Sequence, residues 1–598
     1  MIFFDFEVFK YDWLVVLLDM VNKEKTVIVN DRDALEKYYT KHKSDIWIGF
    51  NVRNYDQFIL KSILCDFNPK DVNDFIIVKG QKGYQYSKLF NKVPLNFFDV
   101  MPNPPIGLKA LEGFMGSDIR ETTVPFDIDR KLTPEELEDV IFYCNHDVEQ
   151  TAMVFGKRLE EFTSQLELVK MFEMPRSDMG KTKAQLSAKA LGAERPSKPR
   201  KDELEFVIPN TLRVTKYKHV VDWFIECRDR ALWNISQCMD YDTVLKEFYE
   251  QKLECEVAGV PHVFAWGGLH GAIPNYVGNG YFVNVDVASF YPSLMIEYDY
   301  ISRNIHDPDH YKNIYRTRLA YKKAKDKRAN PLKIVLNSTY GAMKDKYNQL
   351  YDPRQANNVC VAGQLLLLDL MEHVEKAGTV ATVIQSNTDG VLFKLCATTE
   401  DEADKAFAAL DDLCREWEQR TRMTLEFDEF VRVVQRDVNN YLIVDAEGKY
   451  KSKGAVVKKL NDLDYDLPIV NRAVVNYLVK GVPVERTVNE CNDLREFQKI
   501  YKVSGLYKYA MHNGQKLSER TFRVFASKRD SDTPLYKVKD KPQKDGTIKE
   551  VPEKFASCPE HCFIDNSEVA GKPVPDYLNR DWYIAEAKER IKGFLGEK

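Results

Sequence analysis

Two carboxylates stand one residue apart near the start of the 598-residue chain, in the segment Asp5-Phe6-Glu7. The segment ends a hydrophobic run, and strand alternation would put both acids on one face of a sheet. Side-by-side carboxylates repel each other, and a divalent cation such as magnesium, which prefers oxygen ligands, relieves that repulsion. Taken alone, the tripeptide is more typical of solvated acids on an edge strand.

Further polar residues follow later hydrophobic segments. Asn51 comes directly after the predicted strand 46–50, and Asp56 stands at the start of the next predicted helix. Tyr143 and Asp147 lie four residues apart and therefore on one helix face. Together with the first two acids, this set suits hydrolysis of a phosphodiester by two metal ions. Such hydrolysis needs carboxylates around both ions and no His or Lys base.

A second set of acids lies in the carboxy-terminal half. Asp286 ends a predicted strand, and Asp389 occupies the turn of a predicted hairpin. The net charge of the chain is −5, but residues 312–346, which lie between these acids, are strongly basic. Such a cluster suits binding of phosphates, although a single charge run is more often a solvated helix face. Eleven basic residues against two acids form it: Lys312, Arg316, Arg318, Lys322, Lys323, Lys325, Lys327, Arg328, Lys333, Lys344 and Lys346.

The amino-terminal acids require a sheet and a helix to position them. Strands are predicted at 2–6, 14–18, 27–29 and 46–50, and helices at 33–43 and 55–64. Thr133-Pro134-Glu135-Glu136 is typical of a helix start, with Thr as N-cap, Pro at the first position and Glu at the third. The alternation of elements predicts an α/β domain with a mixed sheet.

The rest of the chain changes character several times. Residues 160–258 are mostly helical in pattern, with a basic, Pro-containing stretch at 195–200. A β-rich region begins near 265 and includes a strand at 284–287. The other predicted elements are a helical hairpin (309–328 and 331–343), a helix (403–420), two β-hairpins (380–384 with 390–394, 441–444 with 450–453) and a loop (527–549).

Composition limits the class of protein. The 11 scattered cysteines suit reduced thiols in a cytosolic compartment. No basic leader precedes the first strand, and no segment approaches the roughly 20 apolar residues that span a membrane. We therefore expect a cytoplasmic protein without a membrane partner.

The amino-terminal set resembles the three exonuclease motifs of the DnaQ-like 3′→5′ exonuclease domains of family B DNA polymerases, in order and spacing. The motifs are Asp5-Phe6-Glu7, the segment from Asn51 to Asp56, and the segment from Tyr143 to Asp147, and Gly107-Leu108-Lys109 between them is also family-like. The resemblance implies that Asp5, Glu7, Asp56 and Asp147 hold two metal ions. It also implies that Tyr143 orients the attacking water and that Asn51 contacts the 3′-terminal strand.

The segment from Asn284 to Ser293 resembles polymerase motif A. The resemblance implies that Asp286 is a metal ligand assisted by the Val287 carbonyl. The backbone at Ser289 and Phe290 would cradle the triphosphate, and Tyr291 would exclude a 2′-hydroxyl.

The segment from Lys333 to Gly341 resembles motif B, with Lys333, Asn337 and Tyr340 on one helix face toward the nucleotide. Arg318 and Lys322 on the preceding helix resemble further triphosphate-binding cations.

Ser386–Gly390 resembles motif C, in which Asp389 would be the second ligand. Here the chain departs from the family, because Asn387 replaces the first acid of the motif. Tyr441 matches a primer-binding tyrosine whose usual lysine is missing, and Lys451 or Lys453 would substitute for that lysine.

The resemblance covers residues 1 to about 460 and implies an RNase H-like exonuclease domain followed by a right-hand polymerase, an α/β and α+β multidomain fold. The expected domains are an exonuclease (1–160), a helical connector (161–258), palm (259–308 and 349–465), fingers (309–348) and a thumb region (466–598).

The expected function is template-directed synthesis from dNTPs at a primer 3′ end, with proofreading, by two Mg²⁺ ions per site and Mn²⁺ as an alternative. The short spacings between motifs predict an ordinary nucleic-acid primer, and the early first motif predicts a phage or mobile-element enzyme in a bacterial host cytoplasm. We expect a monomer whose partners are primer–template DNA and helicase, primase or other replisome proteins. Two alternatives stay open: an exonuclease whose polymerase half is degenerate, and a non-catalytic DNA-binding or replication-scaffold protein.

Overall fold

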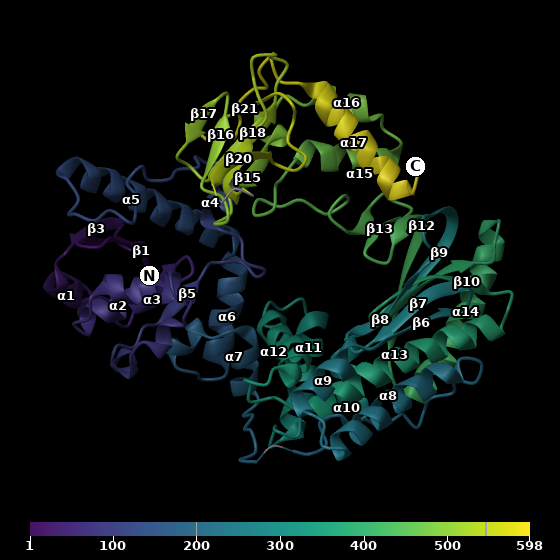
Figure 1. Cartoon of the computed structure of the whole chain (residues 1–598). Coiled ribbons are helices and arrows are strands. Elements are labelled where there is room, and N and C mark those ends of the chain that lie inside the picture. The colour runs from purple at the N-terminus through teal and green to yellow at the C-terminus, as the bar shows by residue number, and fades with distance from the viewer. Residues whose placement is uncertain (199, 544–546, 598) are drawn as a thin grey trace. The chain divides into compact units, whose positions relative to one another are not determined.

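The computed structural model describes residues 1–198, 200–543 and 547–597. The chain forms two compact units (Figure 1). Unit 1 comprises Met1–Lys181, Leu460–Ala473 and Val482–Ala587. Unit 2 comprises Thr182–Lys459, Val474–Gly481 and the last residues from Lys588. The fold is thus mixed α/β with more than one compact body, as the sequence predicts.

A five-stranded mixed sheet organises the amino-terminal part of unit 1, in the order β3-β2-β1-β4-β5. The first three strands are antiparallel, and β4 and β5 run parallel to β1. The prediction of a mixed sheet is confirmed. The strands are β1 (Ile2–Val8), β2 (Trp13–Asp19), β3 (Glu24–Val29), β4 (Trp47–Gly49) and β5 (Phe97–Asp99). The helices are α1 (Arg32–His42), α2 (Asp56–Leu64), α3 (Pro69–Ile77), α4 (Leu108–Met115), α5 (Pro134–Lys157) and α6 (Leu159–Met171).

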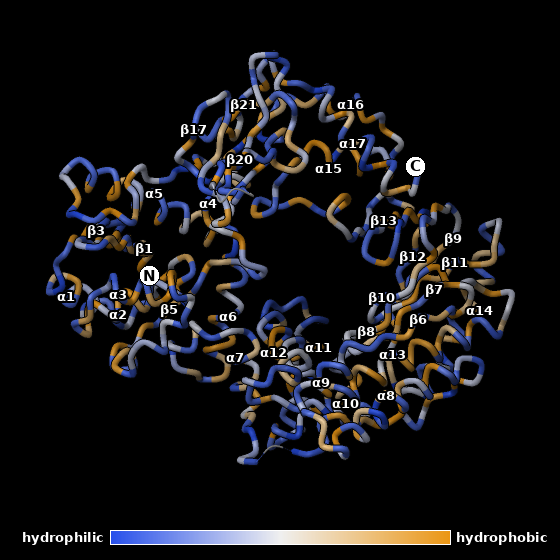
Figure 2. Tube along the Cα trace, in the orientation of Figure 1, coloured by the Kyte–Doolittle hydropathy of each residue, from blue (hydrophilic) through white to orange (hydrophobic). Residues whose placement is uncertain are grey.

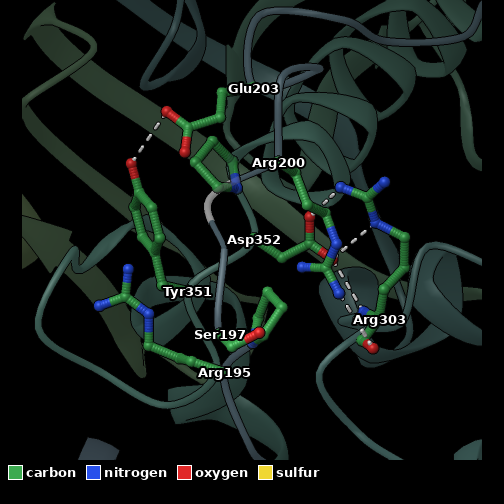
Figure 3. Close-up of a pocket in the computed structure, with 9 residues that line it drawn as sticks. Arg195, Ser197, Arg200, Glu203, Arg303, Tyr351 and Asp352 are labelled. Carbon is green, nitrogen blue, oxygen red and sulfur yellow. Dashed lines mark hydrogen bonds and ion pairs between the residues drawn. The ribbon is translucent and has the colours of Figure 1, made fainter.

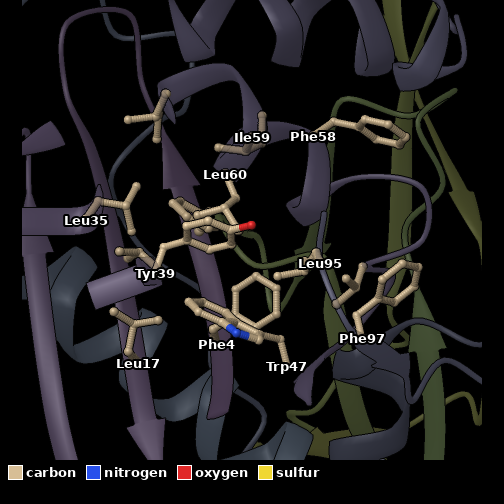
Figure 4. Packing of buried hydrophobic residues seen from close by; sticks show 14 of the residues in the cluster. Phe4, Leu17, Leu35, Tyr39, Trp47, Phe58, Ile59, Leu60, Leu95 and Phe97 are labelled. Atoms are coloured by element: carbon tan, nitrogen blue, oxygen red, sulfur yellow. The ribbon is translucent and has the colours of Figure 1, made fainter. Parts of the chain in front are cut away.

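Strand β1 is covered on both faces. Phe4 and its even-numbered neighbours enter a core with Trp47, whose ring meets that of Phe4 edge-on at 5.2 Å between centroids (Figure 4). On the other face, Phe3 packs edge-on against Phe155 of α5, with 5.3 Å between centroids. Because side chains alternate along a strand, Asp5 and Glu7 share the face that α5 covers.

Helix α5 begins as predicted from its sequence. The Thr133 side chain accepts a hydrogen bond from the Glu136 backbone N–H, the Glu136 side chain accepts one from the Thr133 N–H, and Pro134 is the first helical residue. This capping box fixes where the helix starts and therefore where Tyr143 and Asp147 lie along it.

The carboxy-terminal part of unit 1 contains two small sheets, in the orders β15-β18-β21 and β17-β16-β19-β20. It is joined to the amino-terminal part by the buried Arg523, which donates hydrogen bonds to the carbonyls of Gly113 (3.3 Å) and Ser117 (2.6 Å). The strands are β15 (Lys499–Lys502), β16 (Tyr509–His512), β17 (Gln515–Leu517), β18 (Thr521–Ala526), β19 (Tyr536–Pro542), β20 (Ile548–Lys554) and β21 (Cys562–Ile564). Helix α16 (Val484–Glu490) belongs to this part, whereas α15 (Pro468–Lys480) and α17 (Arg580–Leu595) begin in unit 1 and end in residues of unit 2.

Unit 2 is built on a nine-stranded sheet, in the order β14-β13-β12-β9-β11-β10-β8-β7-β6. Helix α13 (Pro353–Lys376) is buried along nearly its whole length and packs on this sheet. Figure 2 shows hydrophobic residues along these strands and along α13. The strands are β6 (Lys252–Val257), β7 (Val260–Ala265), β8 (Gly268–Ala272), β9 (Tyr276–Val287), β10 (Ala381–Asn387), β11 (Gly390–Leu395), β12 (Leu425–Asp437), β13 (Asn440–Val444) and β14 (Tyr450–Lys453).

The remaining helices of unit 2 include the predicted hairpin, formed by α11 (Pro308–Lys323) and α12 (Ala329–Lys344). Helix α7 packs against α12. The other helices are α7 (Lys183–Ala190), α8 (Lys218–Ser236), α9 (Tyr241–Glu250), α10 (Phe290–Glu297) and α14 (Glu400–Thr421).

Two sequence predictions differ from the structure. Residues 252–257, expected to be helical, form the edge strand β6, which pairs with β7. The predicted loop 527–549 contains strand β19, which pairs with β20 in a hairpin, and its residues 544–546 lie outside the described part of the chain. Strands β6 and β19 are rich in charged residues, which made them hard to recognise from the sequence as strands of a half-buried sheet. Among the described residues, no helix has the length and apolar composition needed to cross a membrane.

Two candidate carboxylate sites

The first candidate site lies in unit 1, where β1 meets α5. Ligating atoms of Asp5, Glu7 and Cys144 all lie within 4.8 Å of one another. The Asp56 side chain accepts a hydrogen bond from the Phe6 backbone N–H at 3.3 Å, which joins the start of α2 to β1. The structure therefore brings the acids of the first two predicted motifs together.

Burial and mutual repulsion raise the pKa values of these acids. The pKa of Asp5 rises to about 7 because the carboxyl is buried and faces Asp147. Burial and the charge of Asp5 raise the pKa of Glu7 and of Asp56 well above their usual values. Burial also raises the pKa of Asp147 to about 6, although Lys109 opposes the shift. Four such carboxyls carry their full charge near neutral pH only if cations compensate them.

One cation of this site, Lys109, was singled out in the sequence only as part of a family-like tripeptide. It forms ion pairs with Asp147 and with the fully buried Glu112, the latter at 3.0 Å. Its Nζ also lies 4.5 Å from the ring centroid of Tyr143. Lys109 therefore contacts both predicted residues of α5, Tyr143 and Asp147. Its other partner, Glu112, is an acid that the sequence patterns did not reveal.

The loop after β4 holds Asn51 in place through a further buried acid. Asp99 at the end of β5 accepts hydrogen bonds from the backbone N–H groups of Asn51 (2.9 Å) and Arg53 (3.0 Å). Asn51 has a positive φ of 63°, a conformation that asparagine tolerates. Its Oδ1 accepts a hydrogen bond from Asn54 at 2.9 Å. Asp99 is a positioning residue that sequence patterns did not reveal.

The second candidate site lies at the ends of the central strands of unit 2. Asp286 on β9 pairs in register with Gly390 on β11, and the Val287 N–H donates to the Asp389 carbonyl at 2.8 Å. Asp286 and Asp389, 103 positions apart in the sequence, are therefore neighbours across two hydrogen-bonded strands. A Cβ on Gly390 would stand 1.9 Å from Asp286 Oδ1, so only glycine leaves room for this carboxylate.

Burial shifts the pKa of both acids, and Asp389 also perturbs Asp286. Burial and the charge of Asp389 raise the pKa of Asp286 to about 6, and a hydrogen bond from Asn284 and the charge of Lys451 oppose the shift. Burial raises the pKa of Asp389, and Lys453 opposes it. Glu426 on β12 pairs in register with Asp286, so its side chain lies on the same face. Sequence patterns did not reveal this third carboxylate, because its place depends on strand register.

The turn after β9 brings the motif A residues to the helical hairpin. Ser289 has a left-handed backbone with φ of 50°, and its Oγ accepts a hydrogen bond from Arg318 Nη1 of α11 at 3.2 Å. The rings of Tyr291 and Tyr340 stack with 4.3 Å between centroids. The structure therefore brings the motif A turn together with Arg318, a basic residue of α11.

The face of α12 that was predicted to bind the nucleotide is only partly exposed to solvent. Lys333 and Asn337 are exposed, whereas Tyr340 is buried beside Tyr291. Lys322 of α11 pairs with Glu426 at 3.6 Å, which connects the hairpin to the strand beside Asp286. Tyr340 therefore supports Tyr291 and leaves the two exposed residues to meet a ligand.

Asn387 lies among the predicted primer-binding residues. Its Oδ1 is 3.4 Å from Lys453 Nζ, and it pairs in register with His270 of β8. Tyr441 pairs in register with Lys453 and hydrogen-bonds Asn387, although burial leaves its pKa raised. Lys451, in contrast, forms an ion pair with Asp428 at 2.6 Å.

Both donor sets fit hard divalent cations. Both consist mainly of carboxylates, which magnesium and manganese prefer, and in each burial and the crowding of acids raise their pKa values. Cys144 in the first site has its own pKa raised by burial, so a neutral thiol beside four acids does not change the preference.

Comparisons with known proteins give partial matches. No protein-family model matches the chain. Three curated proteins named DNA polymerase 1 each match 33% of this chain and 21% of their own length. They are from Saccharolobus solfataricus (27% identical over 202 residues), Sulfurisphaera ohwakuensis (26% over 201) and Sulfolobus acidocaldarius (25% over 201).

Among solved structures, the family B DNA polymerase of Pyrobaculum calidifontis aligns with 99% of this chain and 77% of its own, at 14% identity and a TM-score of 0.41. The sequence matches to the three curated DNA polymerases each span about a fifth of those proteins' length. One third of the chain is homologous to a segment of archaeal DNA polymerases.

Proposed function

We propose that the chain is a DNA polymerase that extends a primer 3′ end with dNTPs and removes mispaired 3′ ends at a separate exonuclease site. The observation that carries the proposal is that Asp389, next to the register partner of Asp286, lies close enough to perturb the Asp286 carboxyl beside a basic helical hairpin whose Arg318 reaches Ser289. Homology of a third of the chain to archaeal DNA polymerases supports it.

At the synthesis site, Asp286, Asp389 and the Val287 carbonyl would hold two magnesium ions. When bound, these ions neutralise phosphate charge and acidify the attacking hydroxyl. Arg318, Lys322 and Lys333 then bind the triphosphate and stabilise the charge that develops on the leaving pyrophosphate.

Nucleotide selection would depend on two other parts of this site. Tyr291, fixed by the stacked ring of Tyr340, lies under the sugar and rejects a 2′-hydroxyl. The backbone at Ser289 and Phe290 cradles the phosphates. Asn337 is exposed on the nucleotide-facing side of α12, where it contacts the nascent pair.

The primer strand would lie over β13 and β14. Tyr441 and Lys453 are neighbours across these strands, and Lys453 also reaches Asn387. Lys453 is therefore the substitute for the missing family lysine that the geometry favours over Lys451, whose Nζ is already paired with Asp428.

At the exonuclease site, Asp5, Glu7, Asp56 and Asp147 would hold the metal pair. Tyr143 orients the attacking water, and Lys109 keeps both Tyr143 and Asp147 in place. Asn51 contacts the 3′-terminal nucleotide from a loop that Asp99 fixes. Because the two acid sets lie in different compact units, each activity keeps its own metals.

Primer extension with magnesium and dNTPs tests the synthetic half. The wild-type chain is expected to extend a primer, and Asp286→Ala and Asp389→Ala are each expected to abolish extension. Full extension by either variant would overturn the proposal. Degradation of the 3′ end without net synthesis, even in excess dNTPs, would instead favour an exonuclease with a degenerate polymerase half.

A further inference from the structure

A basic pocket in unit 2 lies beside the carboxy-terminal end of helix α12 and is used by neither proposed activity. It measures about 170 Å³ and is lined by Arg195, Pro196, Ser197, Arg200, Glu203, Arg303, Tyr351, Asp352 and Pro353. Its first residues are the basic, Pro-containing stretch of the connector. Figure 3 shows Arg195 beside the Tyr351 ring on one side, and Arg200 with Arg303 and Asp352 on the other.

The charges of this pocket are not balanced. Arg303 is neutralised by ion pairs with Asp202 and Asp352, both at 2.6 Å. Arg200 instead donates to the Asn304 side chain (2.7 Å) and the Arg303 carbonyl. Arg195 donates to the Lys346 carbonyl. Among the described residues, neither Arg195 nor Arg200 pairs with a carboxylate, so two guanidinium groups are available to a phosphate.

Two acids line the pocket, and the one that does not pair with Arg303 accepts hydrogen bonds from hydroxyl groups. Glu203 accepts hydrogen bonds from Tyr241 at 2.6 Å and from Tyr351 at 3.4 Å. The Arg195 guanidinium lies 5.1 Å from the centre of the Tyr351 ring, which fixes the arginine without cancelling its charge.

An exposed aromatic stands next to the pocket. Tyr347 is 81% exposed, and the Nζ of Lys346 lies 5.3 Å from its ring centre. Lys346 forms no ion pair with any acid in the described part of the chain. Basic groups interleaved with an open aromatic ring are what single-stranded nucleic acid binds, because its bases are free to stack, whereas those of a duplex are not.

We propose that the pocket, together with Lys346 and Tyr347, binds single-stranded nucleic acid, with a phosphate held by Arg195 and Arg200 and a base stacked on Tyr347. The volume is too small for a complete drug-sized ligand, for which roughly 300 Å³ or more is usual. It does suit one phosphate and sugar of a strand that continues past the pocket.

The proposed polymerase function indicates which strand the pocket binds. Only this identification of the strand rests on the proposed function. Tyr340 lies about 6 Å along α12 from its last residue, Lys344. Lys344 Nζ in turn donates to the Trp266 carbonyl at 3.2 Å, next to the Gly267-Gly268 turn. A strand leaving the nucleotide site along this end of α12 reaches the pocket directly, so the bound strand is the template that has not yet been copied.

Fluorescence anisotropy with a labelled single strand of about twelve nucleotides tests the binding without any catalysis. Arg195→Ala combined with Arg200→Ala is expected to reduce the slope of log K against log salt by about 0.7, since the two arginines hold one phosphate and each phosphate contact on a single strand contributes roughly 0.7. Lys405→Ala combined with Arg415→Ala on α14 removes the same charge elsewhere in unit 2 and is expected to leave the slope unchanged.

Tyr347→Ala covers the case in which the arginine variant folds poorly, since this exposed side chain supports no packing. It is expected to weaken single-strand binding roughly tenfold and to leave binding of a blunt duplex unchanged. Equal losses on duplex and single strand, or wild-type binding by both variants, would overturn the inference. A chain that binds the strand through these residues but never extends a primer would contradict the polymerase proposal and leave this site standing.

Discussion

Replacing Gly390 with alanine places a methyl group where the carboxylate of Asp286 now lies. The added Cβ would stand 1.9 Å from Asp286 Oδ1 and 3.0 Å from the Val285 carbonyl oxygen. Because carbon and oxygen atoms do not approach within about 3 Å without strain, the carboxylate must move by roughly 1 Å. A misplacement of this size at a reacting centre costs about 100-fold in rate. Overpacking at such a site also costs about 1–3 kcal/mol of unfolding free energy.

The assay is single-nucleotide incorporation on a primer–template, measured by rapid quench at saturating dNTP. Gly390→Ala is expected to incorporate at least about 100-fold more slowly than the wild type. It should degrade a 3′ end at the wild-type rate, because the first acid set lies in the other unit. Gly593→Ala, whose Cβ would meet no atom within 4 Å, is the matched control and should leave both rates unchanged. Incorporation by Gly390→Ala at the wild-type rate would refute the placement of Asp286 as a ligand.

Three further predictions follow from the two sites and from the packing of unit 1. Asn387→Asp should retain or raise magnesium-dependent synthesis in a primer-extension assay, since it restores an acid beside Lys453; a collapse of synthesis would show that the amide makes a specific contact. Magnesium should raise the Tm more at pH 8 than at pH 5 in a thermal shift assay, because the pKa values of Asp5 (about 7) and Asp147 (about 6) exceed the unfolded value of about 4. The metal-free fold therefore loses stability as pH rises from about 4 through 7, and an equal shift at both pH values would refute this. Arg523→Met should lower the free energy of unfolding of unit 1 by at least about 3 kcal/mol in urea denaturation, because it removes the side-chain donor from the carbonyls of Ser117 and Ser567; a loss under about 1 kcal/mol would contradict that role.

Local signals in the sequence predicted most elements of the two sheets. Helix α5 starts at its capping box, and alternation along β1 places Asp5 and Glu7 on one face. These signals depend on neighbours within a few residues, so they can be recognised without knowing the fold. The same reasoning predicted the helical hairpin that carries Arg318 and Lys333.

Residues placed by long-range contacts were harder to recognise. Glu426 stands beside Asp286 only because β12 and β9 pair in one register, and Glu112 reaches the first site only through Lys109. Asp99 acts on Asn51 from 48 positions away through backbone hydrogen bonds. None of these acids has a local pattern that distinguishes it from a solvated surface carboxylate. The hairpin of β19 and β20 was missed for a related reason, since its charged strands lack clear alternation.

One chain would carry two separate carboxylate sites, one that lengthens a primer 3′ end and one that shortens it. A single time course on a labelled primer–template with magnesium, resolved by product length with and without dNTPs, tests this most directly in three proteins. The wild type should lengthen the primer with dNTPs and shorten it without them. Asp286→Ala should only shorten it, and Asp5→Ala combined with Glu7→Ala should only lengthen it. Loss of both activities in either variant, with the fold intact by circular dichroism, would contradict the account.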